Sequence, residues 1–314
     1  MRRNHIYPED CIPGMAAHLS AETVDLIVAD PPYFKVVGEK WDYQWRTEED
    51  YIQWSVSWFE QAARVLRLGG SFYLFGYFRI LSLLLPHLEK AGLRLRQQIV
   101  VNKGIQAVSG RATKKYKMFP NVTESILFLY KDPRPFVRDL LRRRQRERGL
   151  TAKEINERLG VKSNGGGMWS IYTGDNVCEQ LPTSEYWDKL QAILEFTYPY
   201  DRLAITFNPQ MGYTDVWDDI NFYQEKDRIH PTQKPLELIR RLVLASSRPG
   251  DLVLDPFMGG GTTAVVCKQT GRTFVGFETD PEYRLKAVQR IRKTPAPFSE
   301  EKSPPPDGIE GQPG

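Results

Sequence analysis

Hydrophobic residues along the chain follow two spacings, one typical of buried strands and the other of amphipathic helices. Five short apolar segments in the first part of the chain predict strands, at residues 5–7, 25–30, 71–76, 95–103 and 124–131. Residues 48–66 and 79–91 have helical spacing instead, and Gly69 and Gly70 follow the first of these helices. One side of that helix carries Tyr51, Trp54, Trp58, Ala62 and Val65. This alternation predicts a mostly parallel sheet with helices on both faces.

The pattern changes between residues 132 and 224, which we interpret as an inserted, mainly helical module. A basic helix is predicted at 136–148, and Thr151 with Glu154 forms a capping-box pattern at the start of a second helix, which Gly160 ends. The pair resembles a helix-turn-helix, although an α-hairpin that only braces the fold fits equally. We expect a glycine-rich loop at 163–176 and a short helix at 184–194.

Strand and helix alternate again after the insert. The spacing predicts helices at 234–247, 259–271 and 281–293, with strands at 251–255 and 272–278. The last segment, 294–314, is rich in proline, glycine and charge, so we expect it to be disordered.

Composition narrows the class of protein. Hydrophobic residues make up 41% of the chain and charged residues 26%, as in ordinary globular proteins. No apolar run reaches the roughly 18 to 20 residues that span a bilayer, and the N-terminus has no apolar core of a signal peptide. Cys11, Cys178 and Cys267 lie far apart, which disfavours a disulfide framework or a cysteine zinc site. We therefore expect a cytoplasmic protein without a membrane partner.

Positive charge is concentrated in two segments, although the net charge is only +4. Residues 103–117 hold five basic residues and no acid, with Lys114 and Lys115 among them. Residues 134–162 hold ten basic residues and four acids, including Arg142, Arg143 and Arg144. Such clusters are typical of phosphate-binding surfaces, but a solvated helix face with a loop gives the same pattern.

A glycine-rich turn joins the strand at 251–255 to the next helix. Gly259, Gly260 and Gly261 allow the backbone to approach a ligand closely, and Glu278 follows the next strand, 23 residues after Asp255. An acid in that place can accept hydrogen bonds from ribose hydroxyls. A P-loop lysine is absent, and Ala264 occupies the third glycine position of a dinucleotide fingerprint. The turn therefore favours a nucleoside ligand without phosphates, with a purely structural turn as the alternative.

Two motifs occur together in the chain, DPPY at 30–33 and DPFMGGGTT at 255–263. The pair resembles the motifs of S-adenosylmethionine-dependent amino-DNA methyltransferases, and HPTQKPLELIRRLV at 230–243 is similar to a third segment of that family. The resemblance implies a Rossmann-like methyltransferase fold, with catalytic and cofactor-binding parts at 1–131 and 225–293 and target recognition at 132–224. The motif order resembles the family's beta arrangement. By the same resemblance, the cofactor contacts are Asp10, Thr232, Gln233, Lys234, Asp255, Phe257, Gly259, Gly261, Thr262 and Glu278.

The DPPY segment then has a chemical explanation. Asp30 and the carbonyl of Pro31 can accept the two hydrogens of an exocyclic amine, which localises its nitrogen lone pair. Pro31 and Pro32 donate no backbone hydrogen bond and hold these acceptors rigidly. Tyr33 offers a stacking surface to a base flipped out of the duplex. In this family, aspartate at the first position goes mainly with adenine N6, so we expect an adenine-N6 DNA methyltransferase, with S-adenosylmethionine as cofactor and double-stranded DNA as partner.

Several alternatives remain at this stage. Cytosine N4 offers the same two hydrogens, RNA could replace DNA, and a non-catalytic DNA-binding protein is a different class of function. A glutamine methyltransferase usually has Asn in place of Asp30, and a zinc deaminase would need an HxE and PCxxC pattern that the chain lacks. The four histidines are too scattered to predict a metal site. A homodimer and a cognate restriction endonuclease are further partners that the sequence leaves open, and we expect DNA contacts at Lys114, Lys115, Arg142, Arg143 and Arg144.

Overall fold

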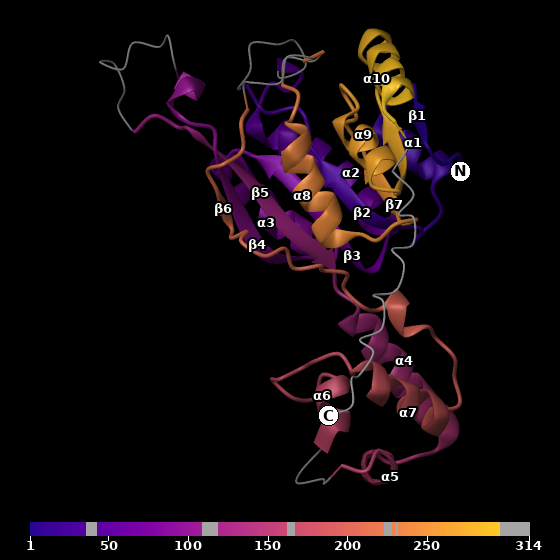
Figure 1. Ribbon diagram of the computed structural model, residues 1–314. Helices are drawn as coiled ribbons and strands as arrows, with labels where there is room; N and C mark the ends of the chain where they lie inside the picture. The colour runs from indigo at the N-terminus through magenta and orange to yellow at the C-terminus, as the bar shows by residue number, and fades with distance from the viewer. Residues whose placement is uncertain (36–42, 109–118, 162–166, 223–227, 230–231, 296–314) are drawn as a thin grey trace, which may run out of the picture.

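One eight-stranded sheet organises the described part of the chain. The computed structural model describes residues 1–35, 43–108, 119–161, 167–222, 228–229 and 232–295 (Figure 1). The strands lie in the order β1-β8-β7-β2-β3-β5-β4-β6. Their bounds are β1 His5–Tyr7, β2 Val24–Ala29, β3 Leu66–Gly76, β4 Leu93–Asn102, β5 Thr123–Lys131, β6 Val216–Trp217, β7 Leu252–Asp255 and β8 Thr273–Phe277.

Most neighbouring strands are parallel, as the alternating pattern predicts. The exception is β5, which pairs antiparallel with both β3 and β4. Near the centre, β2 pairs in parallel with β3 on one side and with β7 on the other. Asp30 follows β2 directly and Asp255 ends β7, so the two sequence motifs meet at one edge of the sheet. The chain continues from β2 to β3 on one side of this point and from β7 to β8 on the other. Open α/β sheets bind their ligands at such a reversal of strand order.

Helices cover both faces of this sheet because consecutive strand side chains point to opposite sides. Along β2, Ile27 and Ala29 pack with the helices α1 (Cys11–His18), α2 (Glu48–Val65) and α3 (Phe78–Lys90). Leu26 and Val28 pack on the other face, with α8, α9 and α10. Those helices span α8 Leu236–Ser246, α9 Thr262–Gln269 and α10 Pro281–Lys293.

Helix α2 begins where local sequence specifies it. Thr47 and Asp50 form a capping box, and Trp58 and Phe59 are fully buried on its inner side. A buried aromatic side chain of this kind contributes roughly 1.5–3 kcal/mol. The strand expected at 71–76 begins earlier, at Leu66, immediately after the helix. The prediction missed this start because the glycines of 66–70 suggest a turn, whereas the segment is buried and Leu66 aligns with Val24.

A second hydrophobic core lies in a helical module formed by residues 134–161 and 167–203. Its helices are α4 Arg134–Arg148, α5 Ala152–Arg158, α6 Gly167–Tyr172 and α7 Ser184–Leu194. The Thr151–Glu154 capping box is present, and Gly160 has a φ of +74°, as predicted. The glycine-rich loop expected at 163–176 is wrong for 167–172, which is helical because Trp169 and Tyr172 are buried in this core. In Figure 1 the module is the separate lobe at the bottom.

The module docks at the beginning of β3. Leu68 belongs to its core, and a Cβ on Gly69 (φ +68°) would lie 2.4 Å from the Leu203 carbonyl oxygen. Because β3 runs parallel to β2, this junction is at the sheet edge opposite Asp30. Residues 204–222 then return to the sheet, where β6 pairs with β4 and Phe222 joins the main core. The second core therefore ends near Leu203, short of the boundary expected at residue 224.

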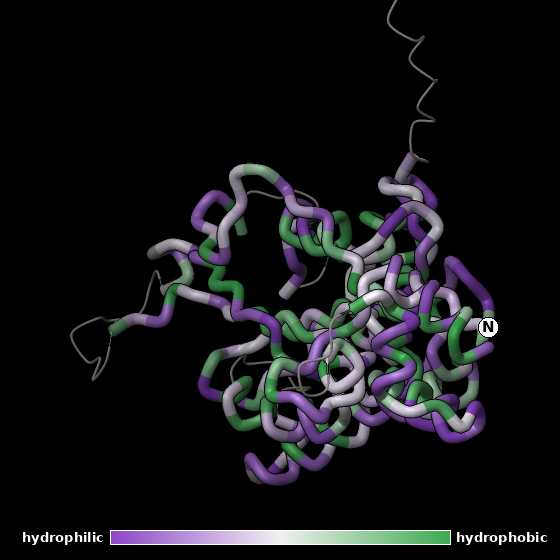
Figure 2. Tube along the Cα trace, turned by 90° about the horizontal axis from the view of Figure 1, so that it is seen from below, coloured by the Kyte–Doolittle hydropathy of each residue, from purple (hydrophilic) through white to green (hydrophobic). Residues whose placement is uncertain are grey.

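Hydrophobic stretches are short throughout the described chain and are interrupted by hydrophilic residues (Figure 2). None of the helices in the described residues is long and apolar enough to cross a membrane.

Candidate active site

One cavity of about 580 Å³ opens at the carboxyl ends of β2 and β7. Its lining combines segments that are far apart in the sequence. The predicted residues that line it are Asp10, Asp30, Pro31, Pro32, Tyr33, Thr232, Gln233, Lys234, Asp255, Phe257, Gly259, Thr262 and Glu278. Trp54 of α2, which the sequence analysis placed only on a packing face, lies 5.8 Å from Phe257 between ring centroids and also lines the cavity.

Gly261 is the one predicted cofactor residue that does not line this cavity. It precedes α9 with a φ of +74°, and a Cβ there would lie 2.9 Å from the Cβ of Ala287. The glycine is therefore required by backbone conformation and by the close packing of α10. Gly259 and Gly260 are the residues of the turn that face the cavity.

Two acids shape the glycine-rich turn from within. Asp255 accepts hydrogen bonds from the Phe257 backbone N–H (3.0 Å) and from the Thr263 hydroxyl (2.6 Å), and burial raises its pKa to about 7. Glu278 accepts from the Gly259 backbone N–H (2.7 Å), and burial raises its pKa as well. These contacts hold the turn between β7 and α9 in a single conformation. Thr263 is a residue that the sequence analysis missed.

The loop segments before α1 and α8 complete the cavity. Asp10 caps α1 by accepting from the Ile12 backbone N–H at 2.8 Å, and its side chain is exposed at the rim. The Gln233 side chain accepts from the Ile229 backbone N–H at 3.2 Å. Thr262 accepts a hydrogen bond from Arg290 at 3.0 Å, which ties the start of α9 to α10.

Asp30 belongs to a buried polar network. The ammonium group of Lys234 lies 3.0 Å from Asp30 Oδ2 and 2.7 Å from Glu124 Oε1. The Tyr33 hydroxyl lies 2.9 Å from Asp30 Oδ1 and 2.8 Å from the same Glu124 oxygen. On the far side of Glu124, Lys103 lies 3.4 Å from its Oε2 atom. The two carboxylates and two lysines together carry no net charge.

Burial and neighbouring charges set the protonation of this network. Burial raises the pKa of Asp30; Lys234 opposes the rise and Glu124 adds to it. Burial also acts to raise the pKa of Glu124, but Lys234 and Lys103 outweigh it and the net shift is downward. For Lys234, burial disfavours the charge, yet Asp30 and Glu124 more than compensate and its pKa rises. Lys234 is therefore a cation held between two acids.

The elbow after β2 is anchored from α2. The Tyr51 hydroxyl donates to the Pro32 carbonyl at 3.1 Å, and Tyr51 is buried. Tyr33 meets Tyr77 edge-on with 5.4 Å between ring centroids. The position of Tyr33 is thus determined both by packing and by its two carboxylate partners.

Glu124 and Lys103 were also missed from sequence. Glu124 lies at the start of β5 and is only 4% exposed. The signal that could have found it is the one that singled out Asp30, namely an acid adjoining a strongly apolar strand.

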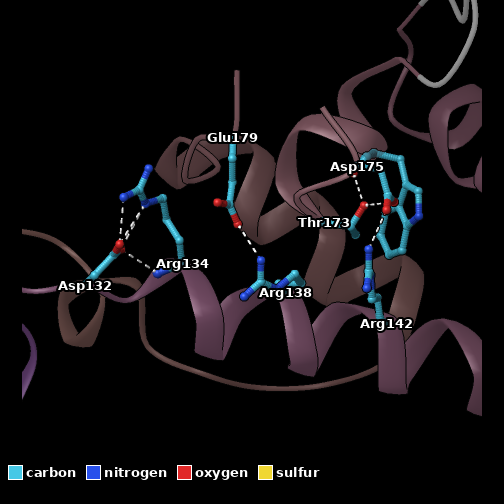
Figure 3. A network of polar contacts seen from close by, with 8 residues as sticks. Asp132, Arg134, Arg138, Arg142, Thr173, Asp175 and Glu179 are labelled. Atoms are coloured by element: carbon cyan, nitrogen blue, oxygen red, sulfur yellow. Dashed lines mark hydrogen bonds and ion pairs between the residues drawn. The ribbon is translucent and has the colours of Figure 1, made fainter. Parts of the chain in front are cut away.

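The arginines of α4 lie at the opposite edge of the sheet, in the helical module. Arg142 is paired with Asp175 at 2.5 Å, and Arg138 with Glu179 at 3.4 Å (Figure 3). Arg144 binds Glu147 at 2.5 Å and also donates to the Glu195 carbonyl, while Arg143 is exposed. Much of the positive charge of this helix is thus paired within the module. Lys114 and Lys115 lie outside the described residues.

Among the described residues, no group of histidine, cysteine and acidic side chains is arranged to hold a metal ion.

Two methyltransferases are among the known proteins with similar sequences. DNA adenine methyltransferase YhdJ of Escherichia coli K12 is 27% identical over 282 residues, which is 87% of this chain and 78% of the relative. Type II methyltransferase M.HpaI of Haemophilus parainfluenzae is 27% identical over 87% of this chain and 70% of its own.

Two solved structures show the same fold. The putative DNA modification methylase TTHA0409 of Thermus thermophilus, complexed with S-adenosyl-L-methionine, matches with a TM-score of 0.54 and 21% identity, over 93% of this chain and 94% of that one. The cytosine-N4-specific PvuII DNA methyltransferase matches with a TM-score of 0.58 and 14% identity, over 97% and 89%. Residues 24–289 match the family described as DNA methylase, so the chain belongs to the N6_N4_Mtase family of DNA methylases.

Proposed function

We propose that this DNA methyltransferase transfers a methyl group from S-adenosylmethionine to the N6 amino group of an adenine flipped out of duplex DNA. One observation carries the proposal. Asp30, a partly buried carboxylate directly after β2, opens into the same cavity as the glycine-rich turn between β7 and α9. An acceptor for the target amine and a site for the methyl donor are thus next to each other.

The cavity suits S-adenosylmethionine better than a phosphate-bearing cofactor. Its acidic lining residues are Glu9, Asp10, Asp30, Asp255, Glu278 and Asp280. Lys234 is the one basic lining residue in the described chain, and two acids already neutralise it. Even with Asp255 protonated, this excess of acids attracts a sulfonium cation and repels phosphates. Its volume of about 580 Å³ is within the usual range for small-molecule sites, roughly 300–1,000 Å³.

Each part of the cavity has a role in this proposal. Glu278 would hold the ribose hydroxyls, Asp10 the adenine end, and Thr232 and Gln233 the methionine end of the cofactor. When bound, S-adenosylmethionine supplies an electrophilic methyl group. Asp30 and the Pro31 carbonyl accept the two amine hydrogens, so that the nitrogen lone pair points at the methyl carbon. Tyr33 stacks on the flipped base, which is worth about 1 to 3 kcal/mol.

Adenine is proposed as the target for two reasons. Asp30 occupies the first position of the DPPY segment, and YhdJ carries adenine in its name. Cytosine N4 is the second candidate, because the PvuII enzyme, which has the same fold, is cytosine-N4-specific. Both amines present two hydrogens to Asp30, so the carboxylate alone does not separate them.

Recognition of the target sequence by residues 132–224 would require the DNA to reach the end of the sheet that lies away from Asp30. The helical module joins β3 at the edge opposite Asp30, and the 11 residues of β3 span roughly 33 Å. A duplex with one base flipped into the cavity would contact Arg142 to Arg144 only if it covered more than this length of the protein surface. Their role in DNA binding stays a prediction, as does that of Lys114 and Lys115.

The proposal is tested by expressing the protein in a bacterial host that lacks DNA methylation and sequencing the modified bases directly. N6-methyladenine within one short sequence, absent for Asp30→Asn, is the expected result. N4-methylcytosine would keep the mechanism and overturn the base. DNA without modification, from protein that binds S-adenosylmethionine in solution, would favour RNA as substrate. Loss of cofactor binding as well would favour a non-catalytic DNA-binding protein. A restriction-modification role, which the name of the type II methyltransferase M.HpaI suggests, and a cytoplasmic location are further parts of this proposal.

A further inference from the structure

Both oxygens of the Asp30 carboxylate are already occupied. Lys234 lies against Oδ2 at 3.0 Å, and the Tyr33 hydroxyl lies against Oδ1 at 2.9 Å. An incoming amine that donates to Asp30 must therefore displace one of these donors or share an oxygen with it. A buried donor that loses its acceptor costs about 1–3 kcal/mol, and more when it is charged. A donor that is displaced from Asp30 therefore needs another acceptor.

Glu124 meets this need by its position. Its Oε1 atom lies 2.7 Å from the Lys234 ammonium and 2.8 Å from the Tyr33 hydroxyl, so it reaches the same two donors as Asp30. A hydroxyl has one hydrogen and can donate to only one of the two carboxylates at a time. Tyr33 can therefore turn its hydrogen from Asp30 to Glu124 without losing a hydrogen bond, and Lys234 keeps a counterion if it draws back from Asp30.

We propose that Glu124 is a positioning residue for methyl transfer, which takes over Tyr33 and Lys234 when Asp30 receives the target amine. The inference rests on the proposed role of Asp30 as the acceptor. Glu124 comes from β5, whose register against β3 and β4 is determined on both sides. Lys103 lies 3.4 Å behind it and keeps it charged. The carboxylate is thus prepared in advance of substrate binding rather than recruited.

The pH–rate profile distinguishes a positioning role of Glu124 from a purely structural ion pair, which would lower the rate without moving the acidic limb. The charged and titratable groups that surround Asp30 are Tyr33, Lys103, Glu124, Lys234 and Asp255. Replacing Glu124 by glutamine leaves Lys234 with Asp30 alone, which tightens that pair. Because Glu124 acts to raise the pKa of Asp30 and Lys234 to lower it, the pKa of Asp30 then falls. The maximal rate should decline while the acidic limb of the pH–rate profile moves to lower pH.

The experiment compares Glu124→Gln, Tyr33→Phe and the double variant with the wild-type enzyme, in single-turnover methylation of a duplex across pH. We expect Glu124→Gln to slow transfer by about 100-fold, the scale of a misplaced reacting group, with unchanged affinity for S-adenosylmethionine by calorimetry. Tyr33→Phe keeps the ring but not the hydroxyl, so the double variant should lose less than the product of the two single effects. Glu60→Gln, an exposed change on α2, is the matched control.

Two further variants make the outcome decisive. Glu124→Asp keeps the charge but shortens the side chain, so it should slow transfer with the acidic limb in its wild-type position, even if Glu124→Gln folds poorly. Wild-type rates in both Glu124 variants, a lowered rate with an unshifted acidic limb in Glu124→Gln, or multiplicative effects with Tyr33→Phe would overturn the inference. Asp30→Asn distinguishes failure of the inference about Glu124 from failure of the proposed function, because full activity in that variant would refute the proposed function itself.

Discussion

The pKa of Asp255 makes a direct prediction about stability. Its carboxyl group is buried, and its pKa rises from an ordinary value of 3.8 to about 7. The folded state therefore keeps this proton at pH values where the unfolded chain has lost it. The stabilisation from this group is fully present below about pH 4 and is lost as the pH rises to 7. At about 1.4 kcal/mol per pKa unit, the loss amounts to about 4 kcal/mol.

The perturbation is Asp255→Asn. The asparagine Oδ1 atom can still accept from the Phe257 backbone N–H, and its NH2 group, in place of Oδ2, can donate to the Thr263 hydroxyl oxygen, but the side chain cannot ionise. The free energy of unfolding of the variant should then exceed that of the wild type by up to about 4 kcal/mol above pH 7, and the difference should vanish near pH 4.

Urea unfolding at a series of pH values measures this difference. Asp30, Asp251 and Glu278 also titrate with raised pKa values, so only the gap between the two curves is diagnostic. Asp139→Asn, an exposed aspartate on α4, should give a curve that runs parallel to the wild type. Parallel curves for Asp255→Asn as well would refute the reasoning, since they would show that Asp255 titrates normally in the folded protein.

Three other predictions concern different parts of the molecule. Asp30→Asn should abolish methyl transfer while calorimetry still shows cofactor binding; loss of both would indicate a structural role for Asp30. Gly261→Ala should lower the free energy of urea unfolding by about 1–3 kcal/mol, because the residue has a positive φ and its Cβ would press on α10, and an unchanged midpoint would contradict this. Replacing Arg142, Arg143 and Arg144 together by glutamine should weaken DNA binding and flatten its salt dependence if α4 contacts phosphates, and an unchanged slope would remove α4 from the interface.

Elements that depend on local pattern were predicted well. The helices α2, α3 and α8 and the strands β2, β7 and β8 lie where their spacing places them. The adjacency of Asp30 and Asp255 was also predictable, because the carboxyl ends of neighbouring parallel strands share one edge of a sheet. Predicting these features requires only the pattern of a few consecutive residues and a general rule of sheet topology.

Contacts that depend on long-range register were not predictable. Glu124 meets Tyr33 from 91 positions away only because β5 runs antiparallel between β3 and β4. An alternating apolar pattern does not state the direction in which a strand enters a sheet. The location of the helical module is a similar case, since nothing in the periodicity of α4 states which edge of the sheet it joins.

The adjacency of β2 and β7 has a consequence for how the protein is made. Asp25, at the start of β2, accepts the backbone N–H of Leu252 at 2.9 Å, a partner that is synthesised 227 residues later. At the usual 5–20 residues per second, that side of β2 waits roughly 10 to 45 s on the ribosome before β7 exists. A nascent strand with an unpaired apolar edge invites pairing with other chains. In the finished fold Asp25 also binds Arg67 of β3 at 2.8 Å, a partner synthesised only 42 residues later. Charged side chains at the edge of an unpaired strand oppose such pairing, so we expect the Asp25 carboxylate to limit it before β7 is made.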